Sequence, residues 1–260
     1  MTQTWSAYVD VVSGDGTRAL IVRVSHDPAA DRAEIWVHAF IDGRVFGHMS
    51  AHPCPSLAAS TTGDARQQAV LDLPGGRFSA HVMASETDRT VFGEGPIALD
   101  VTLAWATDGQ QGSNLRGRNE RLVKVDATVT LDGQCIDLSG WGHQHTQLQE
   151  QPRFAVPFTY LSLRGDEAGL VGLLASNLQR GFGHLRGVAL NATALRVDPP
   201  AVRRTLQMTI ADTHLQGNLS RTYQYWIPMG GGWRDGSIVA GALDGVPVSG
   251  VINDYAGPVG

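Results

Sequence analysis

The chain lacks several features that mark whole classes of protein. Lys124 is its only lysine among 260 residues, its charged fraction is 17%, and its formal net charge is −5. A mildly acidic chain without a Lys/Arg cluster has no electrostatic footprint for nucleic acid. We therefore expect no nucleic-acid partner.

Long apolar runs and paired cysteines are also missing. No stretch approaches the roughly 18 to 20 consecutive apolar residues of a membrane-spanning helix, so we expect no membrane span. Cys54 and Cys135 stand alone, which argues against a disulfide framework or a cysteine-based zinc site. The N-terminus has neither the basic segment nor the apolar core of a signal peptide. We expect a cytoplasmic, reducing setting.

The dominant pattern that is present has a period of two. Apolar residues alternate with polar or small ones along Ile97–Trp105, which predicts a strand with one buried face. Val123–Leu131 alternates in the same way and leads into Asp132-Gly133, a favoured two-residue hairpin turn. The pairs Asp42-Gly43 and Asp244-Gly245 predict similar turns.

Strand patterns recur along the whole chain, and helical signals are nearly absent. Asp64–Leu71 is the one short helix candidate, and a strand competes with it. Many short strands separated by turn residues predict an all-β barrel or sandwich. The stretch Thr107–Asn119 interrupts the pattern, so we place a boundary near residue 112, giving units 1–112 and 113–260. The other predicted strands are Tyr8–Val12, Ala19–Ser25, Glu34–Ile41, Arg77–Ala84, Phe154–Leu163, Leu170–Ala175, Val188–Val197, Leu206–Ala211, Thr222–Ile227, Ser237–Ala242 and Val246–Asn253.

The segment Gly140–Gln147 carries the most informative polar residues. His143 and His145 are two positions apart, so on a strand they project from one face while Gln144 points to the other. Gly140 and Gly142 allow a bulge or a close backbone approach. Paired imidazoles can bind a metal, relay a proton or hold a polar group of a ligand.

A metal site is one alternative for this segment. His143 and His145 are followed by Glu150 in an H-x-H-x4-E spacing that resembles the cupin metal motif, with His184 as the additional ligand. The glycines that the cupin motif places at fixed offsets are missing, and no second half with a third histidine follows. Our main prediction is therefore a site without a metal.

A longer stretch, Asn119–Gln147, runs strand, Asp-Gly turn, strand and then Gly-x-Gly-His-x-His. This order resembles the lipocalin-like family of carotenoid 1,2-hydratases, hydroxyneurosporene synthases and AttH-type proteins. The matching residues extend from Gly140 to His145, and Gly245–Asp254 is similar to the family's closing strand, which ends in an acid. The resemblance covers most of the chain in outline.

The resemblance implies two lipocalin-like antiparallel β-barrel or sandwich units that hold an apolar ligand. Members of this wider group act on terpenoid and polyketide skeletons by hydration, dehydration or cyclisation, and some relatives are pericyclases. Such reactions need a shaped, dry cavity and one well-placed proton donor. Where the family motif has Asp beside His, this chain has Gln144, so proton transfer falls to His143 or His145. An imidazole suits acid–base chemistry on a carbonyl, enol or hydroxyl.

Other candidates extend the predicted site. Asp254 ends the last strand where the family keeps an acid, so we assign it a catalytic role beside the histidines. Trp141 adjoins the histidine pair, and aromatic residues on strands can line a pocket. The predicted substrate-binding residues are Trp141, Gln144, Tyr160, Tyr223 and Trp226.

Further polar residues receive structural interpretations. Glu120 lies between Arg118 and Arg121, which predicts a surface ion pair. Serine hydrolase chemistry is not indicated, because no G-x-S-x-G elbow occurs. The histidines His38, His48, His52 and His81 are isolated in sequence and predict structural roles.

Three functions follow from these observations. The main prediction is a cofactor-independent enzyme, a lyase or isomerase, that encloses an apolar terpenoid- or polyketide-like molecule. It would catalyse cyclisation, isomerisation, hydration or dehydration by histidine acid–base chemistry. The alternatives are a non-catalytic binding protein for a hydrophobic ligand and a metal-dependent cupin-like enzyme.

Overall fold

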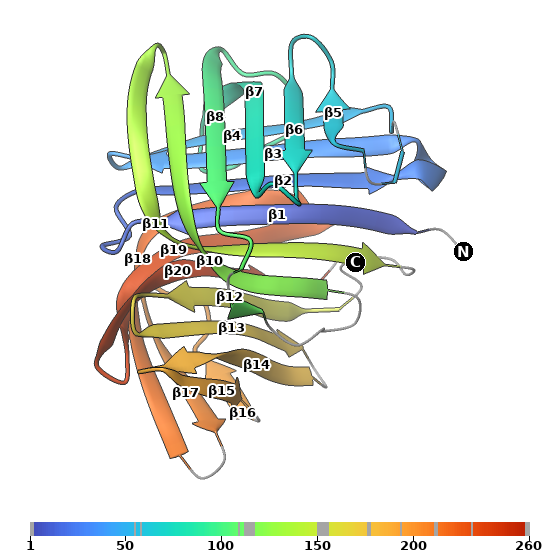
Figure 1. Cartoon of the computed structure of the whole chain (residues 1–260). Helices are drawn as coiled ribbons and strands as arrows, with labels where there is room; N and C mark the ends of the chain where they lie inside the picture. The colour runs from blue at the N-terminus through green and yellow to red at the C-terminus, as the bar shows by residue number, and fades with distance from the viewer. Residues whose placement is uncertain are drawn as a thin grey trace. The chain divides into compact units, whose positions relative to one another are not determined.

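The chain forms two compact β units. The computed structural model describes residues 3–54, 56–57, 59–108, 110–111, 118–149, 156–175, 178–192, 194–210, 213–229 and 231–257. Unit 1 comprises Met1–Val11 with Arg18–Arg153, and unit 2 comprises Val12–Thr17 with Phe154–Gly260. Each unit is built on an antiparallel sheet (Figure 1), so the expected all-β fold with two β units is confirmed.

Eleven strands form the sheet of unit 1, in the order β4-β3-β2-β1-β11-β10-β8-β7-β6-β5 with β9 paired to β10. Phe46 and Gly47 of β4 pair with Glu86 and Ser85 of β7, so the sheet curls until its two sides join. Its elements are β1 Thr4–Val12, β2 Ala19–Asp27, η1 Pro28–Ala30, β3 Arg32–Ile41, β4 Arg44–His52, β5 Thr61–Gly63, β6 Gln68–Asp72, β7 Arg77–Glu86, β8 Ile97–Trp105, β9 Gln110–Gln111, β10 Arg118–Leu131 and β11 Gln134–Gln149.

The curled sheet encloses an aliphatic core. Along β1, the alternate residues Ala7, Val9 and Val11 belong to this core. Tyr8 and Asp10 lie between them in sequence and therefore point to the opposite face of the sheet, where they are also buried. The central strand of unit 1 is thus buried on both faces, and its second face carries polar side chains.

Nine strands form the sheet of unit 2, in the order β15-β14-β13-β12-β20-β19-β18-β17-β16. Its core is aliphatic, with Leu161, Val239 and Ile252 among the buried residues. The strands are β12 Phe158–Arg164, β13 Ala168–Ala175, β14 Leu178–Leu185, β15 Val188–Ala192, β16 Ala194–Val197, β17 Arg203–Ile210, β18 Thr213–Met229, β19 Gly232–Leu243 and β20 Val246–Tyr255.

The Asp-Gly pairs form the hairpin turns that the sequence predicts. Asp42 and Gly43 have φ angles of 50° and 80°, Asp132 and Gly133 have 47° and 78°, and Asp244 and Gly245 have 49° and 79°. Two successive residues with positive φ define the turn whose twist matches that of antiparallel strands. Arg186-Gly187 makes the same turn, with φ angles of 49° and 78°, although its sequence gives a weaker signal.

Some boundaries differ from the sequence prediction. The unit boundary lies between Arg153 and Phe154, whereas the sequence places it near residue 112, because β10 and β11 pair with β8 and β1 and so belong to unit 1. The candidate helix Asp64–Leu71 is a turn followed by β6. Strands β4 and β14 escaped prediction, and Val188–Val197 divides into β15 and β16.

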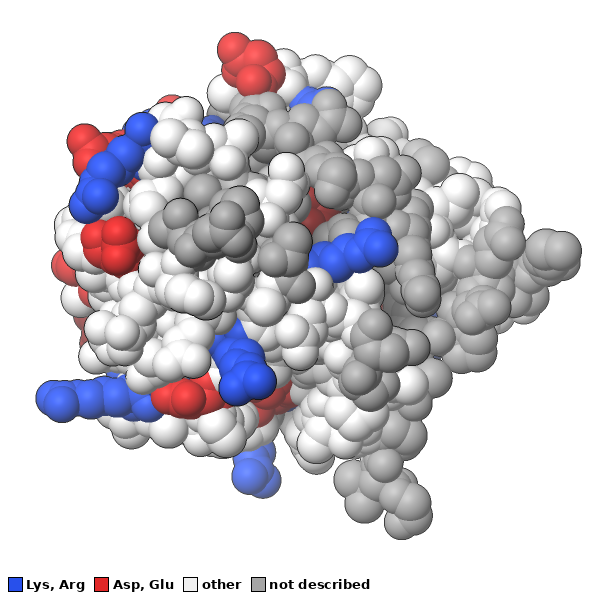
Figure 2. Space-filling view, turned by 90° about the horizontal axis from the view of Figure 1, so that it is seen from below, with Lys and Arg blue, Asp and Glu red and all other residues white. Residues whose placement is uncertain are grey.

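Surface charge is sparse and mixed. Along the left margin of Figure 2, acidic and basic side chains lie next to one another, and broad areas of that face are uncharged. The part of the chain that the structure describes contains no helix with the length and apolar character needed to cross a membrane.

Candidate functional site

The predicted histidine pair lies where three strands of unit 1 run side by side. In the register of β10 and β11, His145 faces Glu120 and His143 faces Leu122. Strand β1 lies on the other side of β11 and supplies Tyr8 and Asp10. We call Tyr8, Asp10, Arg118, Glu120, His143 and His145 the polar cluster.

Gly142 explains how β1 and β11 approach so closely. A Cβ atom at this position would lie 2.2 Å from the carbonyl oxygen of Asp10 and 2.4 Å from Cγ2 of Val125. Both separations are far below van der Waals contact, so only glycine fits. The sequence prediction that a glycine beside the histidines permits a close backbone approach agrees with this geometry.

Asp10 joins β1 to β11 inside the cluster. The Tyr8 hydroxyl donates a hydrogen bond of 2.6 Å to Oδ2 of Asp10, and the backbone N–H of His143 donates one of 3.1 Å to Oδ1. The Tyr8 ring stacks on the His145 ring, with centroids 4.9 Å apart and planes 10° apart. The two imidazoles lie 5.3 Å apart between ring centroids.

Arg118 and Glu120 bring charge to the same place. Nε of Arg118 lies 3.0 Å from Oε1 of Glu120, whose side chain is 0% exposed. A terminal nitrogen of Arg118 also approaches Nε2 of His145 at 3.5 Å. Because a guanidinium only donates hydrogen bonds, Nε2 is the acceptor and a neutral His145 carries its proton on Nδ1. The expected Arg118–Glu120 ion pair exists, but it is buried and not on the surface.

His143 is neutral at physiological pH. Its side chain is fully buried, and this burial, followed by the nearby positive charge of Arg118, lowers the pKa of His143 to about 3. A neutral imidazole donates and accepts hydrogen bonds but supplies no proton as an imidazolium. His143 therefore has a different task from a histidine that titrates near pH 7.

The cluster also contains a possible set of metal ligands. One ligand atom from each of Glu120, His143 and His145 lies within 4.8 Å of the others. This set differs from the cupin-like prediction, because Glu150 lies outside the described residues and His184 belongs to β14 of unit 2. Arg118 contacts both Glu120 and His145, so a guanidinium already supplies positive charge there.

Two more predicted site residues lie on β11. Trp141 shares the face of the histidine pair by strand alternation and is partly buried, and Nζ of Lys124 lies 4.3 Å from the centroid of its ring. Gln144 is buried on the opposite face of the strand.

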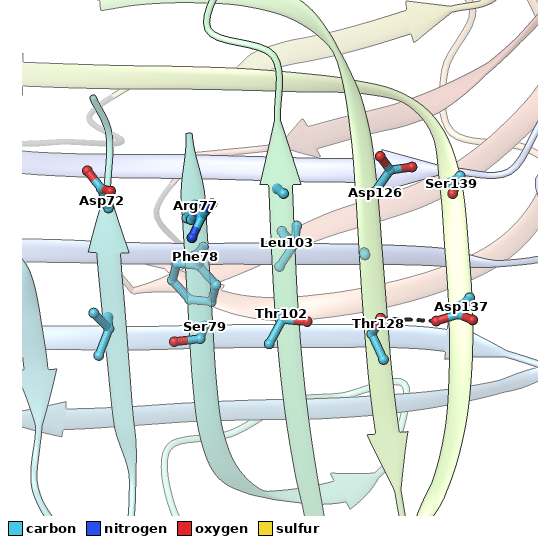
Figure 3. A pocket seen from close by; sticks show the side chains of 13 residues that line it. Asp72, Arg77, Phe78, Ser79, Thr102, Leu103, Asp126, Thr128, Asp137 and Ser139 are labelled. Atoms are coloured by element: carbon cyan, nitrogen blue, oxygen red, sulfur yellow. Dashed lines mark hydrogen bonds between the residues drawn. The ribbon is translucent and has the colours of Figure 1, made fainter. Parts of the chain in front are cut away.

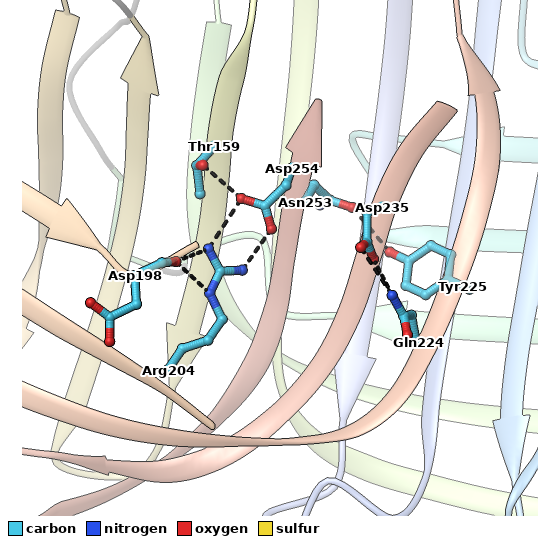
Figure 4. A network of polar contacts seen from close by, with 8 residues as sticks. All are labelled: Thr159, Asp198, Arg204, Gln224, Tyr225, Asp235, Asn253 and Asp254. Carbon is cyan, nitrogen blue, oxygen red and sulfur yellow. Dashed lines mark hydrogen bonds and ion pairs between the residues drawn. The ribbon is translucent and has the colours of Figure 1, made fainter. Parts of the chain in front are cut away.

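The remaining predicted site residues belong to unit 2. Asp254 accepts two hydrogen bonds from Arg204, at 2.6 and 3.1 Å, and one of 2.7 Å from the Thr159 hydroxyl (Figure 4). Tyr160 is buried on β12, and the Tyr223 hydroxyl donates a hydrogen bond of 2.5 Å to the carbonyl oxygen of Thr17. Trp226 is partly buried on β18.

Sequence reasoning missed an acid beside Asp254. Asp235 pairs with Asp254 across β19 and β20 and accepts hydrogen bonds of 3.1 and 2.9 Å from Gln224. Burial raises the pKa of Asp235 above its ordinary value.

Sequence reasoning also missed Tyr8, Asp10 and Arg118 in unit 1 as site residues. The alternation of Tyr8 and Asp10 within a predicted strand was a usable signal.

An open depression lies on another part of unit 1 (Figure 3). Its volume is about 770 Å³, and its lining contains carboxylates such as Asp72, Asp126 and Asp137 together with hydroxyl groups. Thr128 donates a hydrogen bond of 3.0 Å to Asp137 within it. None of the predicted site residues lines this depression, and it is too open to enclose an apolar ligand.

Comparisons with known proteins relate the chain to others by fold. No family model and no curated protein sequence matches it. The structure of an AttH-type protein from Nitrosomonas europaea superposes with a TM-score of 0.65 at 11% identity, covering 98% of this chain and 92% of that one. Kievitone hydratase from Nectria haematococca gives 0.64 at 8% identity, covering 98% and 89%.

A third solved structure, CghA with Sch210972, superposes with a TM-score of 0.59 at 15% identity and covers 99% of this chain and 89% of that one. At such identities, these likenesses establish the fold. They agree with the resemblance to AttH-type proteins that the sequence indicated and extend it over nearly the whole chain.

Proposed function

We propose that the chain is an enzyme that binds an apolar small molecule and moves a proton on it without a cofactor. The reaction class is cyclisation, isomerisation, hydration or dehydration of a terpenoid- or polyketide-like skeleton. The polar cluster of unit 1 is the main support. Fold alone does not assign function, although one structure with this fold is named a hydratase and another holds Sch210972.

The burial of the polar cluster carries the proposal. Asp10, Glu120 and His143 are fully buried, and His145 is nearly so. Burying such groups is costly even when they are paired, and apolar residues of similar volume often stabilise a core as well or better. A concentration of buried titratable groups is therefore typical of sites where chemistry is done.

The geometry suggests a division of roles within the cluster. We assign proton transfer to His145, which stacks on Tyr8 and lies beside the Arg118 guanidinium. His143, held neutral by burial, donates a hydrogen bond to a substrate oxygen, as neutral imidazoles do in other active sites. Arg118 stabilises negative charge that develops on that oxygen. Trp141 provides an apolar surface for the substrate.

The other predicted residues keep more limited roles. Asp254 is bound by the Arg204 guanidinium and the Thr159 hydroxyl, so we propose that it orders the ends of β12, β17 and β20. Contacts of Gln144, Tyr160, Tyr223 and Trp226 with substrate stay predictions.

A panel of terpenoid and polyketide-like enols, enones and polyenes tests the proposal. Products are detected by mass spectrometry as species of unchanged mass or species that differ by one water. For a compound that is converted, His145→Gln should lower kcat on the order of 10²-fold or more. His81→Gln is the matched control, because His81 is an exposed histidine paired with Asp100.

The same experiment separates the alternatives. A compound that binds and is recovered unchanged from wild type indicates a carrier. Unchanged turnover in His145→Gln removes the assigned role of that histidine.

A metal-dependent enzyme is the second candidate, favoured by the proximity of Glu120, His143 and His145. Elemental analysis of protein purified without chelators decides between the two. A stoichiometric transition metal that Glu120→Gln abolishes would support the metal centre and overturn the metal-free mechanism.

A further inference from the structure

A second group of polar side chains lies in unit 1, away from every residue of the polar cluster. His48, Ser50 and His52 alternate along β4 and so share one face of the strand. This face looks toward the aliphatic core, because Ile35 and Val37, the partners of Ser50 and His48 on β3, are core residues. A line of hydrogen-bonding groups therefore runs along the edge of an apolar core.

The carbonyl oxygen of Met83 sets the direction of the hydrogen bonds. It lies 2.8 Å from Nδ1 of His48, and a carbonyl can only accept, so Nδ1 carries the proton. Nε2 of the neutral ring is then an acceptor, and it lies 2.9 Å from the hydroxyl oxygen of Ser50. The Ser50 hydroxyl therefore donates a hydrogen bond to Nε2 of His48.

His52 completes the arrangement from the other side. Its Nε2 lies 2.8 Å from the same hydroxyl oxygen, whose only proton is used in the hydrogen bond to His48. The N–H at Nε2 of His52 therefore donates a hydrogen bond to the Ser50 oxygen. Its Nδ1 faces Oδ2 of Asp64 at 3.8 Å, which is too long for a hydrogen bond.

Burial keeps His48 in its neutral form at neutral pH. Burial lowers the pKa of His48, and the hydrogen bond to Met83 opposes this shift. The charged or titratable neighbours that act on it are His52, on the same strand, and Glu94, in the segment after β7. The neutral ring carries one proton, on Nδ1, and the hydrogen bond to the Met83 carbonyl fixes this tautomer and the orientation of the ring.

We propose that Ser50 is a nucleophile, with His48 as its general base, and that it reacts with activated acyl or phosphonyl groups. The arrangement has the parts that an activated serine needs: a hydroxyl, a base within hydrogen-bond distance and a group that orients the base. Here a backbone carbonyl is the orienting group, and the N–H of His52 stabilises negative charge on the serine oxygen. Alternation along one strand places the base and the nucleophile on the same face without a G-x-S-x-G elbow.

The reaction with a fluorophosphonate defines the chemistry. The Ser50 oxygen forms a bond to phosphorus, the phosphorus–fluorine bond breaks, and fluoride leaves. The hydroxyl proton passes to Nε2 of His48. Ser50 is 7% exposed and Asp64 has a side chain that is 64% exposed, so the reagent enters from the side of His52 and Asp64.

Labelling of the native full-length protein with a small alkyl fluorophosphonate tests the proposal. Intact mass spectrometry should show one added phosphonyl group, and peptide mapping should place it on Ser50. Ser50→Ala should abolish the label, and His48→Gln should slow labelling on the order of 10²-fold. Ser79→Ala is the control, because Ser79 is a more accessible serine on another strand of unit 1.

The pH dependence of wild-type labelling avoids reliance on variants that fail to fold. The rate should rise with pH as His48 loses its proton and reach a plateau near neutral pH. Protein unfolded in urea should not be labelled on Ser50. Absence of the label on native protein, or a label on Ser50 that persists at full rate in a folded His48→Gln variant, overturns the proposal.

Discussion

The imidazole of His143 is buried where water cannot solvate its charged form. Burial and the charge of Arg118 lower its pKa to about 3, whereas an unfolded histidine titrates near 6.5. Below pH 6.5 the unfolded chain therefore binds a proton that the folded chain does not. The contribution of His143 to the free energy of unfolding is therefore largest above pH 6.5. At lower pH this contribution falls by about 1.4 kcal/mol per pH unit.

A variant isolates this contribution. Between pH 7 and pH 5, urea unfolding of the wild type should lose about 2 kcal/mol more than unfolding of His143→Gln. The comparison is needed because burial also lowers the pKa of His26 and His48, which add to the slope in both proteins. Equal slopes for the two proteins would contradict a neutral, buried His143.

A substitution of Tyr8 tests the hydrogen bond between its hydroxyl group and Asp10 in the polar cluster. Tyr8→Phe removes the hydroxyl that donates to Oδ2 of the fully buried Asp10. Loss of one partner of a buried charged group should lower the free energy of unfolding by about 1 to 3 kcal/mol, as measured with urea. Tyr255→Phe is the control and should cost less, because the Tyr255 hydroxyl makes a longer hydrogen bond of 3.5 Å to Met229.

At the scale of strands, the closeness of β1 and β11 depends on Gly142. Gly142→Ala places a methyl group 2.2 Å from the Asp10 carbonyl oxygen, so the two strands must separate. Overpacking of this kind costs about 1 to 3 kcal/mol, and it should also weaken the hydrogen bond from His143 to Asp10. Thermal and urea unfolding measure the loss.

Gly14→Ala provides the matched control for that substitution. No atom lies within 4 Å of where its Cβ would be placed, so stability should change little. If both variants lose the same stability, contact between β1 and β11 does not explain the requirement for glycine at position 142.

The sequence predicts local features of these strands well and their partners poorly. Alternation identified β8 and β10 and placed His143 and His145 on one face, because strand periodicity is a property of neighbouring residues. Asp10 and His143 are 133 residues apart, and no local pattern specifies that β1 pairs with β11. For the same reason, Glu120 could be expected to pair with Arg118, but its burial could not.

The contacts around Ser50 likewise depend on strands that are distant in sequence. His48, Ser50 and His52 stand at alternate positions in the sequence, so their shared face follows once β4 is known to be a strand. The contact of His48 with the Met83 carbonyl comes from β7, 35 residues away, and it decides which atom carries each proton. The absence of a known elbow motif therefore says little about strand-borne serines.

At the scale of the whole chain, the two units are not successive segments. Val12–Thr17 belongs to unit 2, while the residues on either side of it belong to unit 1. In unit 2, Thr222 donates a hydrogen bond of 2.7 Å to the carbonyl oxygen of Gly16, and Tyr223 donates one to Thr17. A single boundary near residue 112 differs from this arrangement, because one cut cannot separate units that each contain two segments of the chain.

This arrangement predicts how fragments of unit 1 behave. Strand β1 lies between β2 and β11 in the middle of the sheet, so a fragment Arg18–Arg153 without it exposes two unpaired strand edges. Far-UV circular dichroism and NMR should show that this fragment lacks a cooperative fold, whereas Met1–Arg153 keeps one. A synthetic peptide with residues 1–17 should restore structure to the shorter fragment, because it supplies the missing central strand. Cooperative unfolding of Arg18–Arg153 alone would mean that β2 and β11 pair without β1, and the polar cluster would then lack the strand that carries Tyr8 and Asp10.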